Sequence, residues 1–277
     1  MARAAVAAVA DRRLLIQEIP AVIDRRYNMT DAAKPEVKVF PNLEELSQAA
    51  ARRFEELTNA RARENKNFAA ALSGGSTPAR LYELLASPNR SIPWARVQLF
   101  QVDERCVPPD HPESNYKMIR AALLQHISIP VSNFHRMAAE NPDRDAASRQ
   151  YAGEMEEVLH PEQGEWPRMD LVFLGMGTDG HTASLFPGSP ALNEYELWVR
   201  PNYSDRLKSF RLTLTYPVLN AAAQVIFLVA GADKAETLRD VFDGARRTPG
   251  FPAQGVQPVN GRLSWYLDQA AARLLSH

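Results

Sequence analysis

The sequence MDLVFLGMGTDGHTASLFPG, residues 169–188, combines a short apolar run with a glycine-rich loop. Its first six residues are almost all apolar, which is typical of a strand buried on both faces of a parallel sheet. Gly175, Gly177 and Gly180 follow within the next six residues. Because glycine has no Cβ, these positions allow a sharp turn and a close approach of the backbone to a ligand. The stretch therefore predicts a buried strand that ends in a ligand-binding loop.

The three glycines also match the G-x-G-x-x-G fingerprint of dinucleotide-binding folds. That fingerprint should open a long helix, whereas Pro187, Gly188 and Pro190 interrupt the chain within a turn or two. A nicotinamide or flavin cofactor is therefore not expected. A metal site is not expected either, because Cys106 is the single cysteine and no two histidines have a ligand spacing. The sequence predicts a site without cofactor or metal.

Asp179 and His181 stand on either side of Gly180 in this loop. An imidazole exchanges protons near neutral pH, and a neighbouring carboxylate can orient it and raise its basicity. The alternative is structural, with Asp179 capping a short helical turn and His181 lying at the surface. We favour the functional interpretation because both residues follow a buried strand in a glycine-rich loop.

A second small-residue loop follows the apolar run at residues 68–72. It consists of residues 73–78 and contains Gly74, Gly75, Ser76 and Thr77, with Pro78 in the first turn of the helix that follows. Free backbone N–H groups at such a helix start can bind an anion such as phosphate. No Gly-Lys-Ser/Thr follows, so the loop is not a Walker A motif. A Ser or Thr cap on an ordinary turn explains the sequence equally well.

Four further charged or polar residues lie after strands or at the start of a helix. Asp103 and Arg105 follow the strand expected at residues 94–102, where Arg105 can meet an anionic group, although a solvated charge cluster is the alternative. Asn115 lies at the start of the next helix and can point into the same site. Lys234 follows the strand at residues 224–230, where a phosphate or simply solvent can meet its amino group.

Strands alternate with helices along the chain, and the loops that carry these residues all follow strands. This pattern predicts a Rossmann-like three-layer α/β/α domain with a mostly parallel sheet, in which the loops meet at one sheet edge. We place a single domain at residues 36–277 and an N-terminal extension at residues 1–35. We expect irregular chain around Trp198 and Arg200, and we interpret residues 264–268 only as the lead into a closing helix.

Composition restricts the class of function. A net charge of -1 and a pI near 6.6 give no electrostatic case for nucleic acid or an anionic membrane, and no run is long enough to span a bilayer. The single cysteine fits a reducing cytosol, so we expect a cytoplasmic enzyme that is a monomer or a small homo-oligomer.

Taken together, three motifs resemble the 6-phosphogluconolactonase family of the glucosamine/galactosamine-6-phosphate isomerase superfamily. They are Ser-Gly-Gly-Ser-Thr-Pro at 73–78, Asp-Glu-Arg at 103–105 with Ser-Asn at 114–115, and the loop at 175–188. The similarity runs from about Lys34 to the C-terminus. The related deaminases share the first motif and the Asp-Gly-His element, but they have an Asp-Glu-Tyr-like sequence where this chain has residues 103–105.

The resemblance implies cofactor-free hydrolysis of 6-phospho-D-glucono-1,5-lactone to 6-phosphogluconate, in the oxidative pentose phosphate pathway. It implies that His181 is the general base, that Asp179 orients it, and that Arg105 steadies the oxyanion. The phosphate would lie against the loop at 74–77, with Arg211 and Lys234 as cationic partners. The alternatives are a deaminase or isomerase of amino-sugar phosphates, and a sugar-phosphate sensor without catalysis.

Overall fold

Seven parallel strands form the main sheet of the computed structural model, which describes residues 35–243 and 250–276. Their order across the sheet, with bounds, is β1 (Glu36–Phe40), β10 (Arg262–Asp268), β9 (Gln224–Val229), β6 (Leu171–Leu174), β2 (Phe68–Leu72), β3 (Val97–Gln101) and β5 (Phe134–His135). Most of the predicted N-terminal extension lies outside the described residues.

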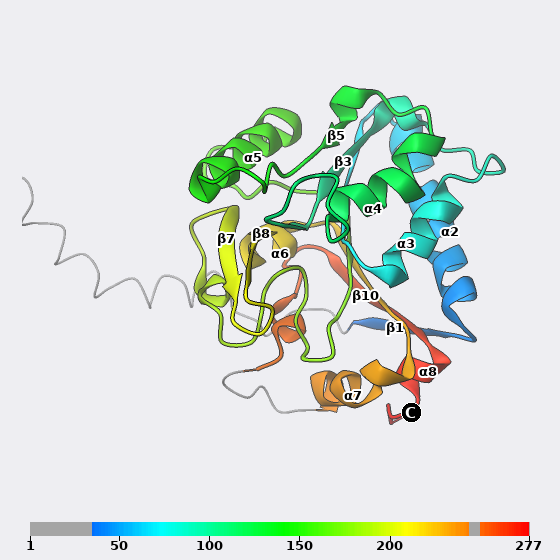
Figure 1. Cartoon of the computed structure of the whole chain (residues 1–277). Coiled ribbons are helices and arrows are strands. Elements are labelled where there is room, and N and C mark those ends of the chain that lie inside the picture. Colours follow the sequence, from blue (N-terminus) through cyan, green and yellow to red (C-terminus); the bar gives the residue numbers. More distant parts are fainter. Residues whose placement is uncertain (1–34, 244–249, 277) are drawn as a thin grey trace, which may run out of the picture. The chain divides into compact units, whose positions relative to one another are not determined.

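Helices cover both faces of this sheet (Figure 1). They are α2 (Leu43–Arg63), α3 (Ser76–Leu85), α4 (Asn115–Ala122), α5 (Arg144–Leu159), α6 (Tyr216–Ala221), α7 (Ala235–Asp243) and α8 (Gln269–Ala272). Single turns of 3₁₀ helix lie at η1 (Trp94–Arg96), η2 (Leu124–His126), η3 (Val131–Asn133), η4 (Pro190–Asn193), η5 (Ala232–Lys234) and η6 (Pro252–Gly255). The predicted three-layer α/β fold with a mostly parallel sheet is confirmed.

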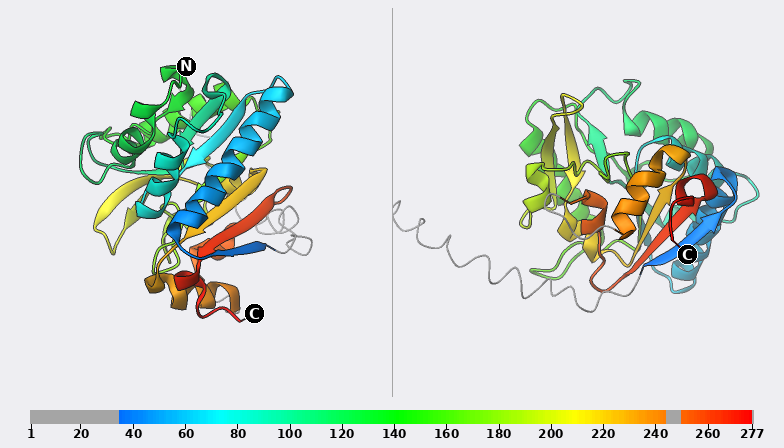
Figure 2. Two further views of the ribbon diagram at one scale, coloured as in Figure 1. Left: turned by 90° about the vertical axis from the view of Figure 1, so that its right-hand side faces the viewer. Right: turned by 90° about the horizontal axis from the view of Figure 1, so that it is seen from below.

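Strand β2 divides the core between the two faces. Phe68, Ala70 and Leu72 pack with residues of α2, α3 and α4, whereas Ala69 and Ala71 pack with residues of α5, α6 and α7. This alternation is the period-2 geometry of a strand covered on both sides, so every position is apolar. Figure 2 (left) shows α2 lying over the strands on its face of the sheet.

Helix α2 illustrates how the sequence sets an element. The Asn42 side chain accepts a hydrogen bond from the backbone N–H of Glu45 at 3.0 Å and so caps the helix start. Leu46, Ala50 and Phe54 recur at helical spacing and are buried. These residues form the apolar face of the helix.

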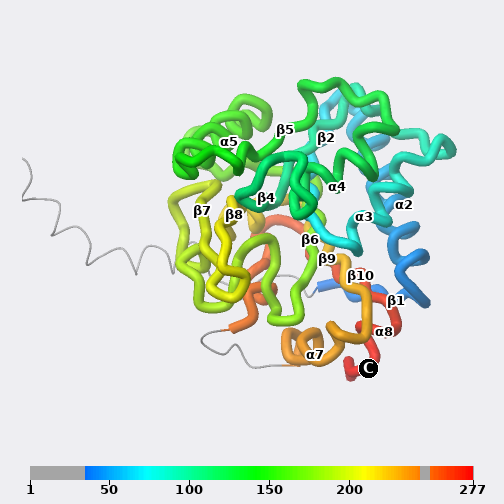
Figure 3. The backbone as a smooth tube through the Cα atoms, viewed as in Figure 1, coloured from blue at the N-terminus to red at the C-terminus, as the bar shows by residue number. Residues whose placement is uncertain are grey.

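A second, antiparallel sheet lies on the side of α5 and contains β4 (Asp103–Arg105), β8 (Ser209–Leu214) and β7 (Val199–Ser204), in that order (Figure 3). Two expectations are corrected here. Residues 103–105 are a strand of this sheet and not a loop, because β8 supplies ladder partners for them. Arg200 lies in β7 and not in irregular chain. The sequence of this strand contains Pro201 and lacks a clear alternation of apolar and polar residues.

The C-terminal segment also differs from expectation. Residues 262–268 form β10, which pairs with both β1 and β9 inside the main sheet, and the closing helix is reduced to the four residues of α8. Trp265 and Leu267 are buried in one core cluster and Tyr266 in the other, so the strand has apolar side chains on both faces. No helix among the described residues is long and apolar enough to cross a bilayer.

The strand order reverses direction between β2 and β6. From β2 the chain moves outward through β3 to β5, and then returns to β6 on the other side of β2 before continuing to β9 and β10. In open parallel sheets the loops after two such strands diverge and leave a crevice at the carboxyl ends, where ligands bind. Here those loops are residues 73–75 and 175–188, the two stretches that the sequence singled out.

Candidate active site

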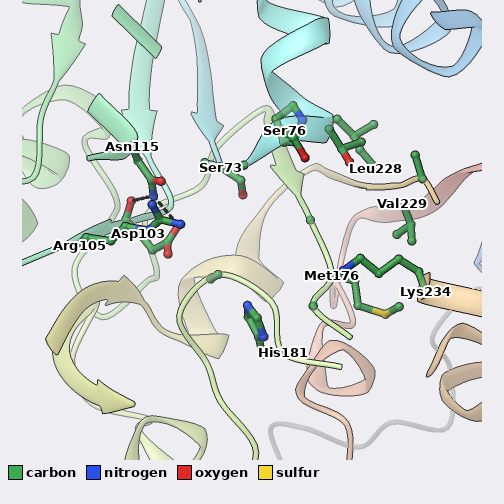
Figure 4. A pocket seen from close by; sticks show the side chains of 18 residues that line it. Ser73, Ser76, Asp103, Arg105, Asn115, Met176, His181, Leu228, Val229 and Lys234 are labelled. Atoms are coloured by element: carbon green, nitrogen blue, oxygen red, sulfur yellow. Dashed lines mark hydrogen bonds between the residues drawn. The ribbon is translucent and has the colours of Figure 1, made fainter. Parts of the chain in front are cut away.

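A pocket with a cavity volume of about 270 Å³ opens at this point of reversal (Figure 4). It is lined by Ser73, Gly74, Gly75, Ser76, Thr77, Pro78, Asp103, Arg105, Asn115, Gly175, Met176, Gly177, His181, Ala183, Leu228, Val229, Ala230 and Lys234. The predicted loops therefore meet at one edge of the sheet. In Figure 4, Asp103, Arg105 and Asn115 lie on one side, Met176 and Lys234 on the other, and His181 between them.

His181 is held by the loop that follows β6. The backbone N–H of Gly177 donates to the carbonyl of His181 at 2.8 Å, and the Thr182 hydroxyl donates to the carbonyl of Gly175 at 2.8 Å. A Cβ on Gly177 would overlap the imidazole of His181, so only glycine allows this turn to close against the ring. The glycines that mimic a dinucleotide fingerprint thus make room for a side chain.

Asp179 and His181 form a hydrogen-bonded pair. Oδ1 of Asp179 lies 2.5 Å from Nδ1 of His181 and 3.2 Å from the His181 backbone nitrogen. Burial by itself raises the pKa of Asp179, but the hydrogen bond and charge of His181, with a contribution from Arg206, bring that pKa below its ordinary value. Asp179 is therefore an anion that occupies Nδ1, which leaves Nε2 as the ring nitrogen for proton transfer.

Hydrogen bonds attach the loop after β2 to β6 and to α3. The Ser73 hydroxyl donates to the carbonyl of Phe173 at 2.7 Å, and the Tyr82 hydroxyl donates to the carbonyl of Ser73 at 2.7 Å. Helix α3 then starts at Ser76, and Gly75 is its N-cap without a side-chain cap. The alternative of a Ser or Thr cap is therefore not what the structure has, and the start of α3 faces the pocket with small residues.

Asn115 lies directly against Gly74, whose missing Cβ leaves the space for its amide. The amide Nδ2 donates to the carbonyl of Asp103 at 2.9 Å and to its Oδ1 at 3.3 Å, and the Ser184 hydroxyl donates to Oδ2 of Asp103 at 2.6 Å. Asp103 is thus held from both sides and connects α4 with the loop after β6.

Glu104 is buried and accepts hydrogen bonds at both oxygens. Oε1 accepts from the backbone N–H groups of Arg105 and Asn115, at 2.7 and 2.8 Å. Oε2 accepts from the side chains of Gln101 and Ser114 and from the backbone of Tyr116, at 2.9, 3.2 and 2.7 Å. One carboxylate therefore sets both β4 and the start of α4.

The cationic residues predicted for the site are only partly brought together. Arg105 lines the pocket, and its Nη1 donates to the backbone carbonyl of Glu113. Lys234 also lines it and pairs with Asp233 at 3.2 Å. Arg211 is opposite Arg105 in the β4–β8 ladder, but it is buried and is not among the lining residues. Burial and the positive charge of Arg105 lower the pKa of Arg211.

Within residues 35–243 and 250–276, no group of three or more His, Cys, Asp or Glu side chains is placed to hold a metal ion. The charged and polar groups of the pocket instead favour an anionic, hydroxyl-bearing ligand, with an apolar wall formed by Met176, Leu228 and Val229 on one side. An imidazole with a carboxylate at Nδ1 can act as a general acid or base. A guanidinium in the same pocket can stabilise negative charge.

The family model of glucosamine-6-phosphate isomerases/6-phosphogluconolactonase matches residues 41–265. The chain belongs to this family. It is 44% identical over 207 residues to a protein of Synechocystis sp. named 6-phosphogluconolactonase, which covers 74% of this chain and 83% of that protein. A human protein of the same name is 41% identical over 250 residues, covering 87% of this chain and 93% of the relative.

Solved structures of the family give the same result. The structure of 6-phosphogluconolactonase from Leishmania guyanensis superimposes with a TM-score of 0.79 at 30% identity, over 88% of this chain and 100% of that one. The family predicted from the three motifs is confirmed.

Arg206 contacts Asp179, and the sequence analysis did not predict this contact. It follows β7 and its Nη1 lies 3.0 Å from Oδ2 of Asp179. Neither its spacing nor its surroundings in the sequence indicate this contact. Glu104 belongs to the Asp-Glu-Arg motif, but its set of hydrogen-bond partners depends on how β4 meets α4 and is not visible in the sequence.

Proposed function

We propose that this protein hydrolyses 6-phospho-D-glucono-1,5-lactone to 6-phosphogluconate. The observation that carries the proposal is the Asp179–His181 pair beside Arg105 in a pocket whose other end is the start of α3 and Lys234. The names of the relatives described above support the substrate. We predict that the reaction requires no cofactor.

In the proposed reaction His181 is the general base. Nε2 takes a proton from a water molecule as its oxygen attacks the lactone carbonyl carbon, and Asp179 holds the ring through Nδ1. The carbonyl oxygen becomes an oxyanion, which Arg105 stabilises. The bond between the carbonyl carbon and the ring oxygen then breaks, and the imidazolium returns the proton to that oxygen. General-base assistance contributes about 10²–10⁴ in rate and one oxyanion donor about 10²–10³.

In the proposed complex, the phosphate of the substrate lies at the other end of the pocket. Backbone N–H groups at a helix start are suited to an anion, and Ser76 and Thr77 begin α3 there. Lys234 supplies a cation beside them. Arg211, the ladder partner of Arg105, does not line the pocket, so we propose that it contributes positive charge without direct contact with the phosphate.

The test compares two reactions of the purified protein. We expect freshly generated 6-phosphogluconolactone to disappear faster than its spontaneous hydrolysis, and no ammonia to be released from glucosamine 6-phosphate. Ammonia release would assign the chain to deaminase chemistry. If neither reaction exceeded its background, the sensor alternative would replace the proposal.

A further inference from the structure

The turn between β7 and β8 brings Arg206 close to Asp179 of the Asp179–His181 pair. Residues 205–208 form this turn, which the backbone N–H of Leu207 closes by donating to the Ser204 hydroxyl at 3.2 Å. The side chain of Arg206 is 63% exposed, yet its Nη1 reaches Oδ2 of Asp179 at 3.0 Å. The two strands therefore position a cation beside a carboxylate that is distant in sequence.

The two oxygens of Asp179 then have different partners. Oδ1 accepts from His181, at the backbone and at Nδ1, while Oδ2 accepts from Arg206. A carboxylate held at both oxygens cannot rotate about its Cβ–Cγ bond without breaking one contact. Arg206 thereby fixes the plane in which Asp179 meets the imidazole.

We propose that Arg206 is a positioning residue that orients Asp179 against the His181 imidazole and offsets the negative charge of that carboxylate. The proposal rests on the role of His181 given above. Arg206 does not line the pocket, so it acts through Asp179 and not on the substrate.

Electrostatics gives the sign of the effect. The Asp179 anion favours the imidazolium form of His181, and the Arg206 cation opposes that form. The other charged groups that line the pocket are Asp103 and Arg105 of β4 and Lys234 of η5, and a change at Arg206 leaves all three in place. Loss of the cation should therefore move the acid limb of the activity to higher pH.

The test uses Arg206→Gln and Arg206→Lys in the full chain, with Lys208→Gln as the matched control. Lys208 lies in the same turn and its amino group pairs only loosely with Asp205, at 3.8 Å. We expect Arg206→Gln to lower kcat about 2- to 10-fold, with a smaller change in KM. The acid limb of the pH–rate profile should move to higher pH in Arg206→Gln, but not in Arg206→Lys or in the control.

A second measurement requires no substrate. The pH titration of ring resonances in histidine-labelled protein follows His181 directly, and His181→Asn assigns its signal among the six histidines. A shift to higher pH in Arg206→Gln supports the inference even if the lactone is not the substrate. An unmoved titration overturns it. So does an unmoved acid limb with a KM raised more than about tenfold, because that result would make Arg206 a direct ligand of the substrate.

Discussion

The amide of Asn115 occupies the space that a Cβ at position 74 would need. A methyl group at position 74 would overlap that amide, so Gly74→Ala must displace Asn115 or the loop after β2. We predict a loss of at least about tenfold in kcat/KM, because small displacements of positioning groups are costly. The matched control is Gly153→Ala in α5, where nothing lies within 4 Å of an added Cβ. Steady-state kinetics of the control should match the wild type, and its stability should rise by about 0.5–1 kcal/mol.

Asp179 gives a second prediction, in stability. Its folded-state pKa lies below the ordinary value, so its contribution is fully present above the unfolded pKa of about 3.9 and is lost as the pH falls through the folded value. Asp179→Asn should therefore be less stable than the wild type at about pH 7, and the difference should narrow by about pH 3. Denaturant unfolding at the two pH values measures this.

The control for that experiment is Asp205→Asn, whose side chain is 93% exposed in the β7–β8 turn. It should show no comparable dependence on pH. A wild-type advantage over Asp179→Asn that stayed constant into acid would contradict the assignment of a half-buried, ion-paired carboxylate.

Single residues were predictable from the sequence where their chemistry is local. Asp179 and His181 are two positions apart in one loop, so their pairing follows from sequence spacing. Arg206 is 27 positions from Asp179, and only the β7–β8 turn brings them together. Arg211 was expected in the pocket, but the side chain of this ladder partner of Arg105 is buried and does not line the pocket.

The joint between β4 and α4 depends on the buried carboxylate of Glu104. All five of its partners are donors, so Glu104→Gln would turn an amide N–H₂ group toward N–H and O–H donors. We predict a destabilisation of about 1–3 kcal/mol and a fall in kcat/KM, since Arg105 and Asn115 both depend on this joint. Thermal unfolding and kinetics test this.

Glu113→Gln is the matched control for this joint. Glu113 is exposed, and Arg105 contacts its backbone carbonyl and not its side chain. Both stability and turnover should stay close to the wild type. Equal effects of the two substitutions would show that the buried carboxylate has no special role.

Elements with a clear period were predicted, and those set by partners were not. Helix α2 and strands β2, β6 and β9 have continuous or periodic apolar residues, which local sequence reveals. Strand β4 has three charged residues and exists because β8 pairs with it. Strand β10 was interpreted as the lead into a helix, although its position between β1 and β9 makes it a central strand.

The pocket as a whole is built from residues 73 to 234, and the family match begins at residue 41. We therefore predict that a chain beginning at Lys34 retains the turnover of the full chain within about twofold. Kinetics of both proteins under the same conditions test the proposed division at residues 35 and 36. A large loss of turnover would assign the first residues a part in the active domain.

The proposed hydrolysis depends most on His181 acting as the general base in this crevice. The most direct test is kcat/KM for 6-phosphogluconolactone in the wild type and in His181→Asn, at neutral pH and after subtraction of spontaneous hydrolysis. We predict a loss of about 10²–10⁴, with a thermal unfolding midpoint close to that of the wild type. A folded His181→Asn variant that hydrolyses the lactone at the wild-type rate would contradict the role of His181 as general base.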